Sequence, residues 1–472
     1  MYLEPLLAFI SQLHTPERVF MSRSFPMLPY FYSLQFTLGI NVASLFDLAK
    51  TCYGDYFRIR VFGTSVYCIT NPSAISALEK YLSWNTSHKT PVTNGTAGPF
   101  LQEVNPGFLL FTDLSHHKSR KSTINHFFTS VDNDTYIARL TTEYRKILPS
   151  LRAKPFFDLS DPLFTPFMVN LVSYHFYGIT FELDEISRLD KYLKRALWIF
   201  RLSLALPAPL IRSRFSPFLT GFREERAKVR YQLQSRLLEN TSCPFQAKYI
   251  NSFQEKYLNS DHSVKCAASV LTDDALGLFI AGIDTVMASL DLILKIISSY
   301  PSVCEQIRNE YHEVTGDFDH YDARLLKYAR CVVLEVLRLY PVFPHLFKTV
   351  TEELVVDGFL LPSKSLLYIH LSSIHRDSRW FVDPLLFKPE RWSGYVFSSD
   401  STNTFLPFGL GAHHCPGAEL AILELSALIS LLLADFHVCD HQFLKEGGLP
   451  NIPLLFNGLS IRPRRRAFLV PL

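Results

Sequence analysis

The chain lacks a long apolar run near its N-terminus. Residues 6–10 form a short apolar stretch, far below the roughly 20 residues that span a bilayer, and no basic residue precedes it. We therefore expect neither a transmembrane anchor nor a signal peptide. The expected location is intracellular, either cytoplasmic or peripherally associated with a membrane.

The chain also has few cysteines and little net charge. The eight cysteines of the 472-residue chain are scattered, and no two have the C-x-x-C spacing of a zinc or redox motif. We expect no disulfide framework, which fits a reducing compartment. The formal charge of +3 at pH 7 is small for this length, so no general affinity for nucleic acid is expected.

Apolar residues are plentiful, since 48% of the chain is hydrophobic and 14% is aromatic. That composition is typical of a globular protein. Strand-like runs lie at 56–62 and 65–70 and return at 354–371, where Asp357-Gly358 predicts a turn. Without a repeat or a linker, we predict a single monomeric domain over 1–472 that is mostly α with a small β portion. Its expected parts are a β-rich region at about 1–85, a helical core at about 110–340 and a functional loop at 405–417.

The segment 271–299 is long and apolar enough to suggest a transmembrane helix. Three charged residues interrupt it, each costly at bilayer depth: Asp284, Asp291 and Lys295. Thr272, followed by two aspartates, predicts an N-cap, and Pro301 predicts the far end. The sequence therefore favours a buried core helix.

A glycine-rich segment holds the residues with the clearest chemistry. Residues 405–417 read FLPFGLGAHHCPG, and a helix is predicted directly after them at 418–433. Backbone amides of such a loop, with the positive end of the following helix, are expected to lower the pKa of the Cys415 thiol. They also temper the electron density on the sulfur, which sets its behaviour as a metal ligand.

The spacing Phe408-x-x-Gly411-x-x-x-Cys415-x-Gly417 resembles the haem-binding loop of the cytochrome P450 superfamily. A lone cysteine is usually a small buried hydrophobe, but four fixed positions across ten residues disfavour that alternative. The resemblance implies a cytochrome P450 fold with haem b between a long distal helix and the helix after the cysteine loop. It also implies that Cys415 is the iron ligand and that Phe408, Gly409, Gly411 and Gly417 surround the cofactor.

Glu335 and Arg338 have the spacing of one helix face, in an apolar stretch that ends at Pro341. Surface pairs of this kind are common and contribute little, but the apolar neighbours favour burial. In the family, an arginine from a P-E-R segment completes this pair, and Arg391 has that position here. The resemblance therefore implies a buried structural network of three charges.

Ala281-Gly-Ile-Asp284-Thr285 lies midway along the predicted core helix. Gly and Thr inside a helix loosen its hydrogen-bond ladder and favour a local groove. Asp284 and Thr285 resemble the proton-delivery pair of the family, and Ala281 would contact the cofactor. A tight helix crossing at Gly282 is the structural alternative.

His116 and Arg120 are four residues apart and resemble the family helix that binds the haem carboxylates. His413 has another carboxylate-contacting position. Lys348 stands where many relatives have arginine, so a bidentate contact is lost there.

By the same resemblance, an apolar substrate pocket lies above the haem, which suggests a hydrophobic small-molecule substrate. The residues expected to line it are Phe111, Leu278, Ala281, Val342, Phe343, Leu346 and Phe456. The apolar, basic segment 196–222 fits a lid over this pocket and a peripheral membrane contact equally well.

The resemblance implies a monooxygenase that inserts one oxygen atom of dioxygen into its substrate. Because the haem domain accounts for the whole sequence, electrons from NAD(P)H are expected to come through a separate reductase or ferredoxin, docking near Lys118 and Lys121. One alternative is a haem-thiolate isomerase or dehydratase without a reductase, and another is a non-catalytic haem-binding protein. Asp284 and Thr285 argue against both.

Overall fold

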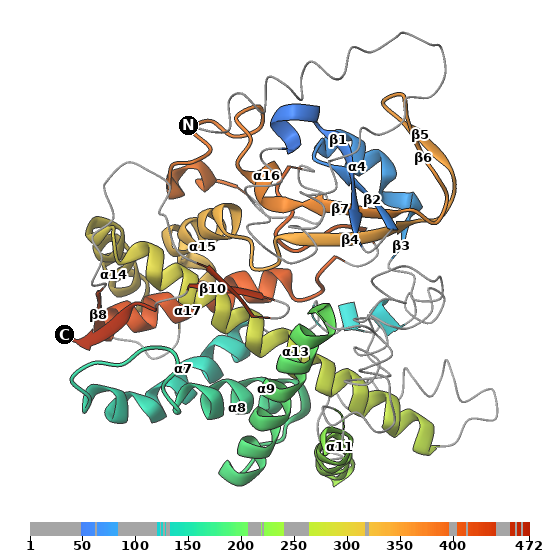
Figure 1. The fold of residues 1–472 in the computed structure, drawn as a ribbon. Helices are drawn as coiled ribbons and strands as arrows, with labels where there is room; N and C mark the ends of the chain where they lie inside the picture. Colours follow the sequence, from blue (N-terminus) through green and yellow to red (C-terminus); the bar gives the residue numbers. More distant parts are fainter. Residues whose placement is uncertain are drawn as a thin grey trace. The chain divides into compact units, whose positions relative to one another are not determined.

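The computed structural model of the protein describes most of the chain. The described residues are 49–61, 64–83, 120–122, 124–125, 128, 133–205, 219, 221–239, 264–316, 321–395, 404–411, 414–439, 454–457, 460–463 and 466–472. They belong to two compact units (Figure 1). The first unit comprises residues 1–95, 343–384 and 398–414, and the second comprises 96–342, 385–397 and 415–472. The expected single domain stays a prediction.

The first unit is built on a five-stranded sheet of order β1-β2-β7-β4-β3. β2 and β7 are parallel, and the other neighbours are antiparallel. The elements of this unit are β1 Tyr56–Val61, β2 Thr64–Ile69, α4 Pro72–Leu78, η1 Glu79–Tyr81, β3 Leu82–Ser83, β4 His345–Val350, β5 Leu354–Val356, β6 Phe359–Leu361, β7 Leu366–His370 and α16 Leu371–His375. The strands predicted near residues 56–70 and 354–371 are confirmed.

Alternating side chains give this sheet two apolar faces. Ile69, Leu367 and Ile369 lie in one buried cluster, while Cys68 and Tyr368 lie in the other. The sheet is therefore covered on both sides.

The predicted turn at Asp357-Gly358 is confirmed. Val356 pairs with Phe359, so only these two residues connect β5 to β6. Both have positive φ angles, 48° for Asp357 and 81° for Gly358. Two-residue hairpin loops favour this conformation because its twist matches that of the strands, and Asp-Gly adopts it readily.

The second unit is mostly helical. Its elements are α7 Asn133–Arg152, α8 Phe164–Tyr177, α9 Leu183–Ala205, α11 Phe222–Glu239, α13 Val264–Ile297, α14 Pro301–Thr315, η3 Ala323–Leu325, α15 Lys327–Leu339, η4 Pro389–Trp392, α17 Ala418–Asp435, β8 Phe436–Cys439, β9 Leu454–Asn457, β10 Ser460–Pro463 and β11 Phe468–Pro471. The 34-residue helix α13 contacts α8, α11, α14, α15 and α17 (Figure 1). A mostly α fold with a small β portion is thereby confirmed.

Helix α13 corrects one expectation from the sequence. It begins at Val264, so Thr272 is not its N-cap but lies inside the helix with Asp273 and Asp274. All three residues are buried. The two acids pair with arginines from other elements instead of with a helix end, which the sequence pattern did not reveal.

The same helix is the one described segment that is long and apolar enough to cross a membrane. The candidate span is Ser269–Ile297, and 71% of its most apolar window is buried inside the protein. This burial favours the core helix over the membrane span, as the charged residues predicted.

The predicted charge network around Glu335 is present. Glu335 and Arg338 are both fully buried in α15 and form a bidentate pair, with Nε to Oε2 and Nη2 to Oε1 both at 2.8 Å. Arg391 Nε donates to Glu335 Oε1 at 3.1 Å. Two charges of opposite sign are therefore buried together with well-aligned hydrogen bonds.

Two further donors complete this network, and the sequence did not predict them. Trp392 Nε1 donates to Glu335 Oε2 at 2.9 Å, and the backbone amide of Lys388 donates to Oε1 at 2.9 Å. Trp392 directly follows the P-E-R segment, but an indole gives no charge signal by which a sequence pattern could identify it. The network thus ties α15 to residues 388–392.

We predict that Glu335→Ala lowers the free energy of unfolding by about 3–5 kcal/mol, because it leaves a buried arginine uncompensated. Urea unfolding and the haem content of the purified protein measure this. Glu305→Ala is the matched control, because Glu305 and Arg308 have the same spacing in α14 and Glu305 is exposed. The control should cost about 0–1 kcal/mol. Equal stability losses in the two variants would contradict the structural role of the network.

Helix α17 holds a buried carboxyl group of a different kind. Glu424 is 4% exposed, and its Oε1 has no hydrogen-bond partner among the described residues. Burial raises the pKa of Glu424 to about 7, while a hydrogen bond with Tyr136 of α7 opposes the rise. The protonated form therefore suits this position.

This carboxyl group predicts a pH dependence of stability. Between its unfolded pKa near 4.5 and its folded pKa of about 7, the folded protein binds the proton more tightly, so its contribution to stability is lost as pH rises. Glu424→Gln should stabilise the protein at pH 8 by about 3 kcal/mol relative to its effect at pH 4.5. Urea unfolding at the two pH values measures this difference. An effect equal to that of exposed Glu305→Gln at both pH values would count against a buried, protonated Glu424.

Candidate active site

Cys415 lies three residues before α17, in a segment that turns at Pro416 and Gly417. Its thiol is free, and the backbone amide of Gly417 donates a hydrogen bond to its sulfur. The amide donor expected from the loop is therefore present. Donation to a sulfur favours its anionic form.

The net pKa of Cys415 differs from the sequence-based prediction. Burial raises the pKa of the Cys415 thiol, and this outweighs the lowering by the Gly417 amide and by Lys121. The predicted lowering by a loop amide is present, but the net shift is upward, because the spacing of residues does not reveal the burial of the sulfur. A bound metal cation deprotonates a coordinating thiol outright, so this donor set fits a thiolate ligand of iron.

Lys121 and Phe128 lie against the cysteine loop. Lys121 is half-buried, and burial lowers its pKa to about 8 while the charge of Cys415 opposes the fall. A Cβ atom on Gly417 would lie 3.3 Å from a ring carbon of Phe128. Glycine at position 417 therefore lets the Phe128 ring approach the backbone that contacts the sulfur. Lys118, the other proposed docking residue, lies outside the described residues.

The middle of α13 forms an open stretch in an otherwise buried helix. Residues 275–277 and 286–297 are buried, whereas Ala281 is exposed and Asp284 and Thr285 are half-buried. Among the described residues, nothing lies within 4 Å of where a Cβ atom on Gly282 would be. The absence of neighbours at Gly282 argues against the tight helix crossing.

Thr285 loosens the helix at this stretch in the way its sequence context predicts. Its Oγ1 donates to the carbonyl oxygen of Ala281 at 2.6 Å, and Ser289 Oγ donates to the carbonyl oxygen of Thr285 at 2.8 Å. Such side-chain bonds to the preceding turn tend to bend a helix. The Thr285 hydroxyl thus lies at the open part of α13.

Arg120 is buried in the second unit and pairs with Asp274 of α13. Its Nε lies 3.3 Å from Asp274 Oδ2, and its Nη2 donates to Oδ1. The aspartate was visible in the sequence, but its pairing with Arg120, 154 positions away, was not predicted. His116 and His413, the other predicted carboxylate contacts, lie outside the described residues.

The predicted cofactor residues of the first unit surround the start of the cysteine loop. Gly409 and Gly411 have φ angles of 79° and 67°, which other residues rarely adopt. Lys348 is buried, and its Nζ lies 3.5 Å from the carbonyl oxygen of Leu410. The amide of Leu406 donates to His375 Nε2 at 2.9 Å. Phe408 is half-buried. These contacts fix the backbone of residues 406–411.

The predicted pocket residues are divided between the units. In the second unit, Leu278 is half-buried beside Ala281 on α13, and Val342 is buried. In the first unit, Phe343 is half-buried and Leu346 belongs to the apolar core. Phe111 lies outside the described residues, and for Phe456 only the backbone, in β9, is described.

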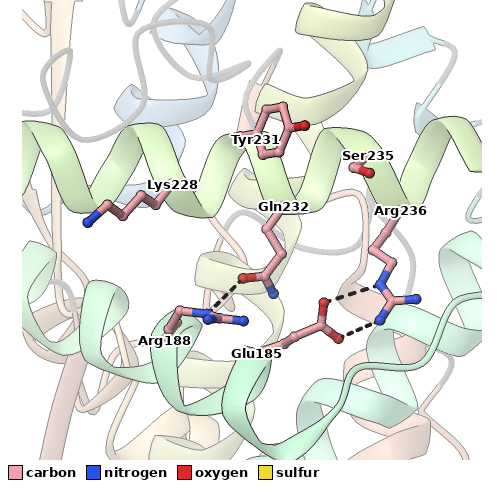
Figure 2. A pocket seen from close by; sticks show the side chains of 7 residues that line it. All are labelled: Glu185, Arg188, Lys228, Tyr231, Gln232, Ser235 and Arg236. Atoms are coloured by element: carbon pink, nitrogen blue, oxygen red, sulfur yellow. Dashed lines mark hydrogen bonds and ion pairs between the residues drawn. The ribbon is translucent and has the colours of Figure 1, made fainter.

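A separate groove of about 460 Å³ lies between α9 and α11 (Figure 2). Arg236 forms a bidentate pair with Glu185 at 3.2 and 2.9 Å, and Arg188 Nε donates to Gln232 at 3.2 Å. The remaining lining residues are Lys228, Tyr231 and Ser235. Four of its seven lining residues are charged, so the groove does not suit a hydrophobic substrate.

Comparisons with known proteins agree with this geometry. The cytochrome P450 family model matches residues 23–465. The probable cytochrome P450 4ac1 of Drosophila melanogaster is 26% identical over 74% of this chain and 71% of its own length. Cytochrome P450 4V2 of Homo sapiens is 30% identical over 39% of this chain and 36% of its own length.

A solved structure of retinoic acid bound cyanobacterial CYP120A1 shares the fold. It has a TM-score of 0.73 and 20% sequence identity, and the match covers 95% of this chain and 99% of that one. This likeness concerns the fold. The chain therefore belongs to the cytochrome P450 family and is a haem-thiolate monooxygenase.

Proposed function

We propose that Cys415 is the thiolate ligand of haem b and that the protein inserts one oxygen atom of dioxygen into a hydrophobic small molecule. The observation that carries this proposal is the Cys415 sulfur, which accepts a hydrogen bond from the backbone amide of Gly417, the N-cap residue of α17. When bound, the haem supplies the iron at which dioxygen is reduced and oxygen is transferred. The protein supplies the ligand, the orientation and the protons.

The residues around the sulfur regulate how strongly it donates electrons. The Gly417 amide and the Lys121 ammonium both favour negative charge on Cys415 and also withdraw electron density from it. Arg120 would donate hydrogen bonds to a haem carboxylate, with His116, His413 and Lys348 as further contacts. Phe408, Gly409 and Gly411 would lie against the haem face near the cysteine.

Asp284 and Thr285 would deliver protons beside the open stretch of α13. The Thr285 hydroxyl donates to the Ala281 carbonyl in this structure, and rotation about its side chain would redirect it toward the cofactor side. Asp284 is half-buried, so it would take up protons from solvent and pass them to Thr285 or to water. A positioned donor of this kind contributes roughly 10²–10⁴-fold to a proton-transfer step.

The substrate would be hydrophobic because the candidate lining is apolar. Leu278 and Ala281 present small or aliphatic side chains at the open part of α13, and Val342, Phe343, Leu346, Phe111 and Phe456 would add to them. The cyanobacterial relative binds retinoic acid, a largely apolar molecule. We further propose that electrons from NAD(P)H reach the haem through a separate reductase or ferredoxin.

The segment 196–222 keeps its two proposed roles. α9 extends to Ala205 and α11 begins at Phe222, while residues 206–218 lie outside the described part of the chain. Whether it acts as a lid or as a peripheral membrane contact stays a prediction.

We predict that Cys415→Ser abolishes the thiolate-type ferrous–CO absorption band and the activity. A serine hydroxyl does not supply the electron donation of a thiolate. Difference spectroscopy of the reduced, CO-treated protein measures the band. Cys439→Ser is the control, because this exposed thiol should leave the spectrum unchanged. A Cys415→Ser variant with an intact band would disprove the ligand assignment.

We predict that Thr285→Ala lowers the ratio of product formed to reduced cofactor consumed, while hydrogen peroxide rises to match. The variant removes the donor hydroxyl but leaves Cys415 and the apolar lining in place, so ligand binding and the ferrous–CO band should survive. Without a positioned donor, water would supply the proton unselectively, and reduced dioxygen would leave as hydrogen peroxide. Thr285→Ser, which keeps the hydroxyl, is the matched control. An unchanged ratio with no extra peroxide would shift the role to Asp284 or favour the isomerase alternative.

A further inference from the structure

Two adjacent buried carboxylates lie on α13, about two turns before its open stretch. Asp273 is 6% exposed and Asp274 is 2% exposed. Neighbouring negative charges repel each other, and burial makes each costly unless it has its own partner. Each of these acids is paired with an arginine from a different part of the second unit.

The two pairs connect α13 to different elements. Asp273 pairs with Arg230 of α11, a helix that α9 also holds through Glu185 and Arg236. Asp274 pairs with Arg120, whose segment lies against the cysteine loop at Gly417. Only the second pair therefore includes a residue that is expected to meet the cofactor.

The geometry of the second pair fixes the orientation of Arg120. Both oxygens of Asp274 are engaged, one by Nε at 3.3 Å and the other by Nη2. A guanidinium is a rigid planar fork, so two parallel bonds determine the direction of its plane. It has five N–H donors, and bonding to Asp274 through two of them does not prevent donation to a second carboxylate.

We propose that Asp274 is a positioning residue that holds the Arg120 guanidinium in place for a haem carboxylate. This inference rests on the proposed function, because it needs haem beside Arg120. Asp274 also compensates the buried arginine before haem binds, so the site is formed without waiting for the cofactor. Asp273 is the same residue type at the adjacent position, but it pairs with Arg230 of α11. It is therefore an internal control.

The test compares haem release from the purified, haem-loaded protein and its variants. The rate of haem transfer to excess apomyoglobin, followed by absorbance, is the measurement. Asp274→Asn should release haem about tenfold faster or more. The reason is that the Arg120 guanidinium would no longer be aligned for its hydrogen bond to the haem carboxylate. Asp273→Asn should change the rate by less than about twofold, since Arg230 is not expected to meet the haem.

A double-variant cycle separates positioning from a general structural role. If Asp274 acts through Arg120, Asp274→Asn should not speed haem release any further in an Arg120→Gln background. The double variant has no uncompensated buried charge, so it remains informative even if Asp274→Asn alone does not fold. Asp274→Glu, which keeps the carboxylate, should restore the slow release at least in part.

The reduction potential of the haem provides a second measurement, which general destabilisation of the protein would not change. Asp274→Asn removes a negative charge beside the Arg120–carboxylate contact and should shift the potential in the positive direction, whereas Asp274→Glu should leave it near its original value. Equal haem release from the Asp273 and Asp274 variants would overturn the inference. So would a full Asp274→Asn effect in the Arg120→Gln background. Failure of the unsubstituted protein to bind haem would instead overturn the proposed function.

Discussion

The carboxylate of Glu335 has no contact with solvent and accepts hydrogen bonds from Arg338, Arg391, Trp392 and the backbone of Lys388. Burial of this charge is tolerated only because every donor is in place. The bonds join α15 to residues 388–392, and α15 contacts α17. Cys415 lies three residues before α17, so the network is linked to the helix that follows the candidate iron ligand.

The same constraint shapes α13. Its buried acids in the N-terminal half are compensated by Arg120 and Arg230, and Asp291 in the C-terminal half accepts from Arg466 Nε at 3.0 Å. Because the charges of these acids are paired, they can lie inside α13, which continues through Thr272 as one helix. Between the two compensated regions lies the open stretch at 281–285, where the reaction is proposed to occur.

Electrostatics at Cys415 combine two opposing effects. Enclosure of the sulfur favours the neutral thiol, while the Gly417 amide and Lys121 favour the thiolate. A cation bound to Cys415, such as the iron of the proposed haem, would shift this balance to the thiolate. The amide and the ammonium then limit its electron donation.

The sequence by itself determined the features that depend on spacing within one segment. Glu335 and Arg338 face the same way because residues three apart share a helix face, and Asp357-Gly358 forms a turn because both tolerate positive φ. The family itself could be identified from the loop that ends at Gly417. Only the tertiary structure decided what depends on distant partners. Asp274 meets Arg120 across 154 positions, Trp392 completes the Glu335 network, and burial reverses the expected pKa shift of Cys415. In each case the physical cause is a contact with a residue outside the local segment, or burial by such residues, and local spacing in the sequence does not determine either.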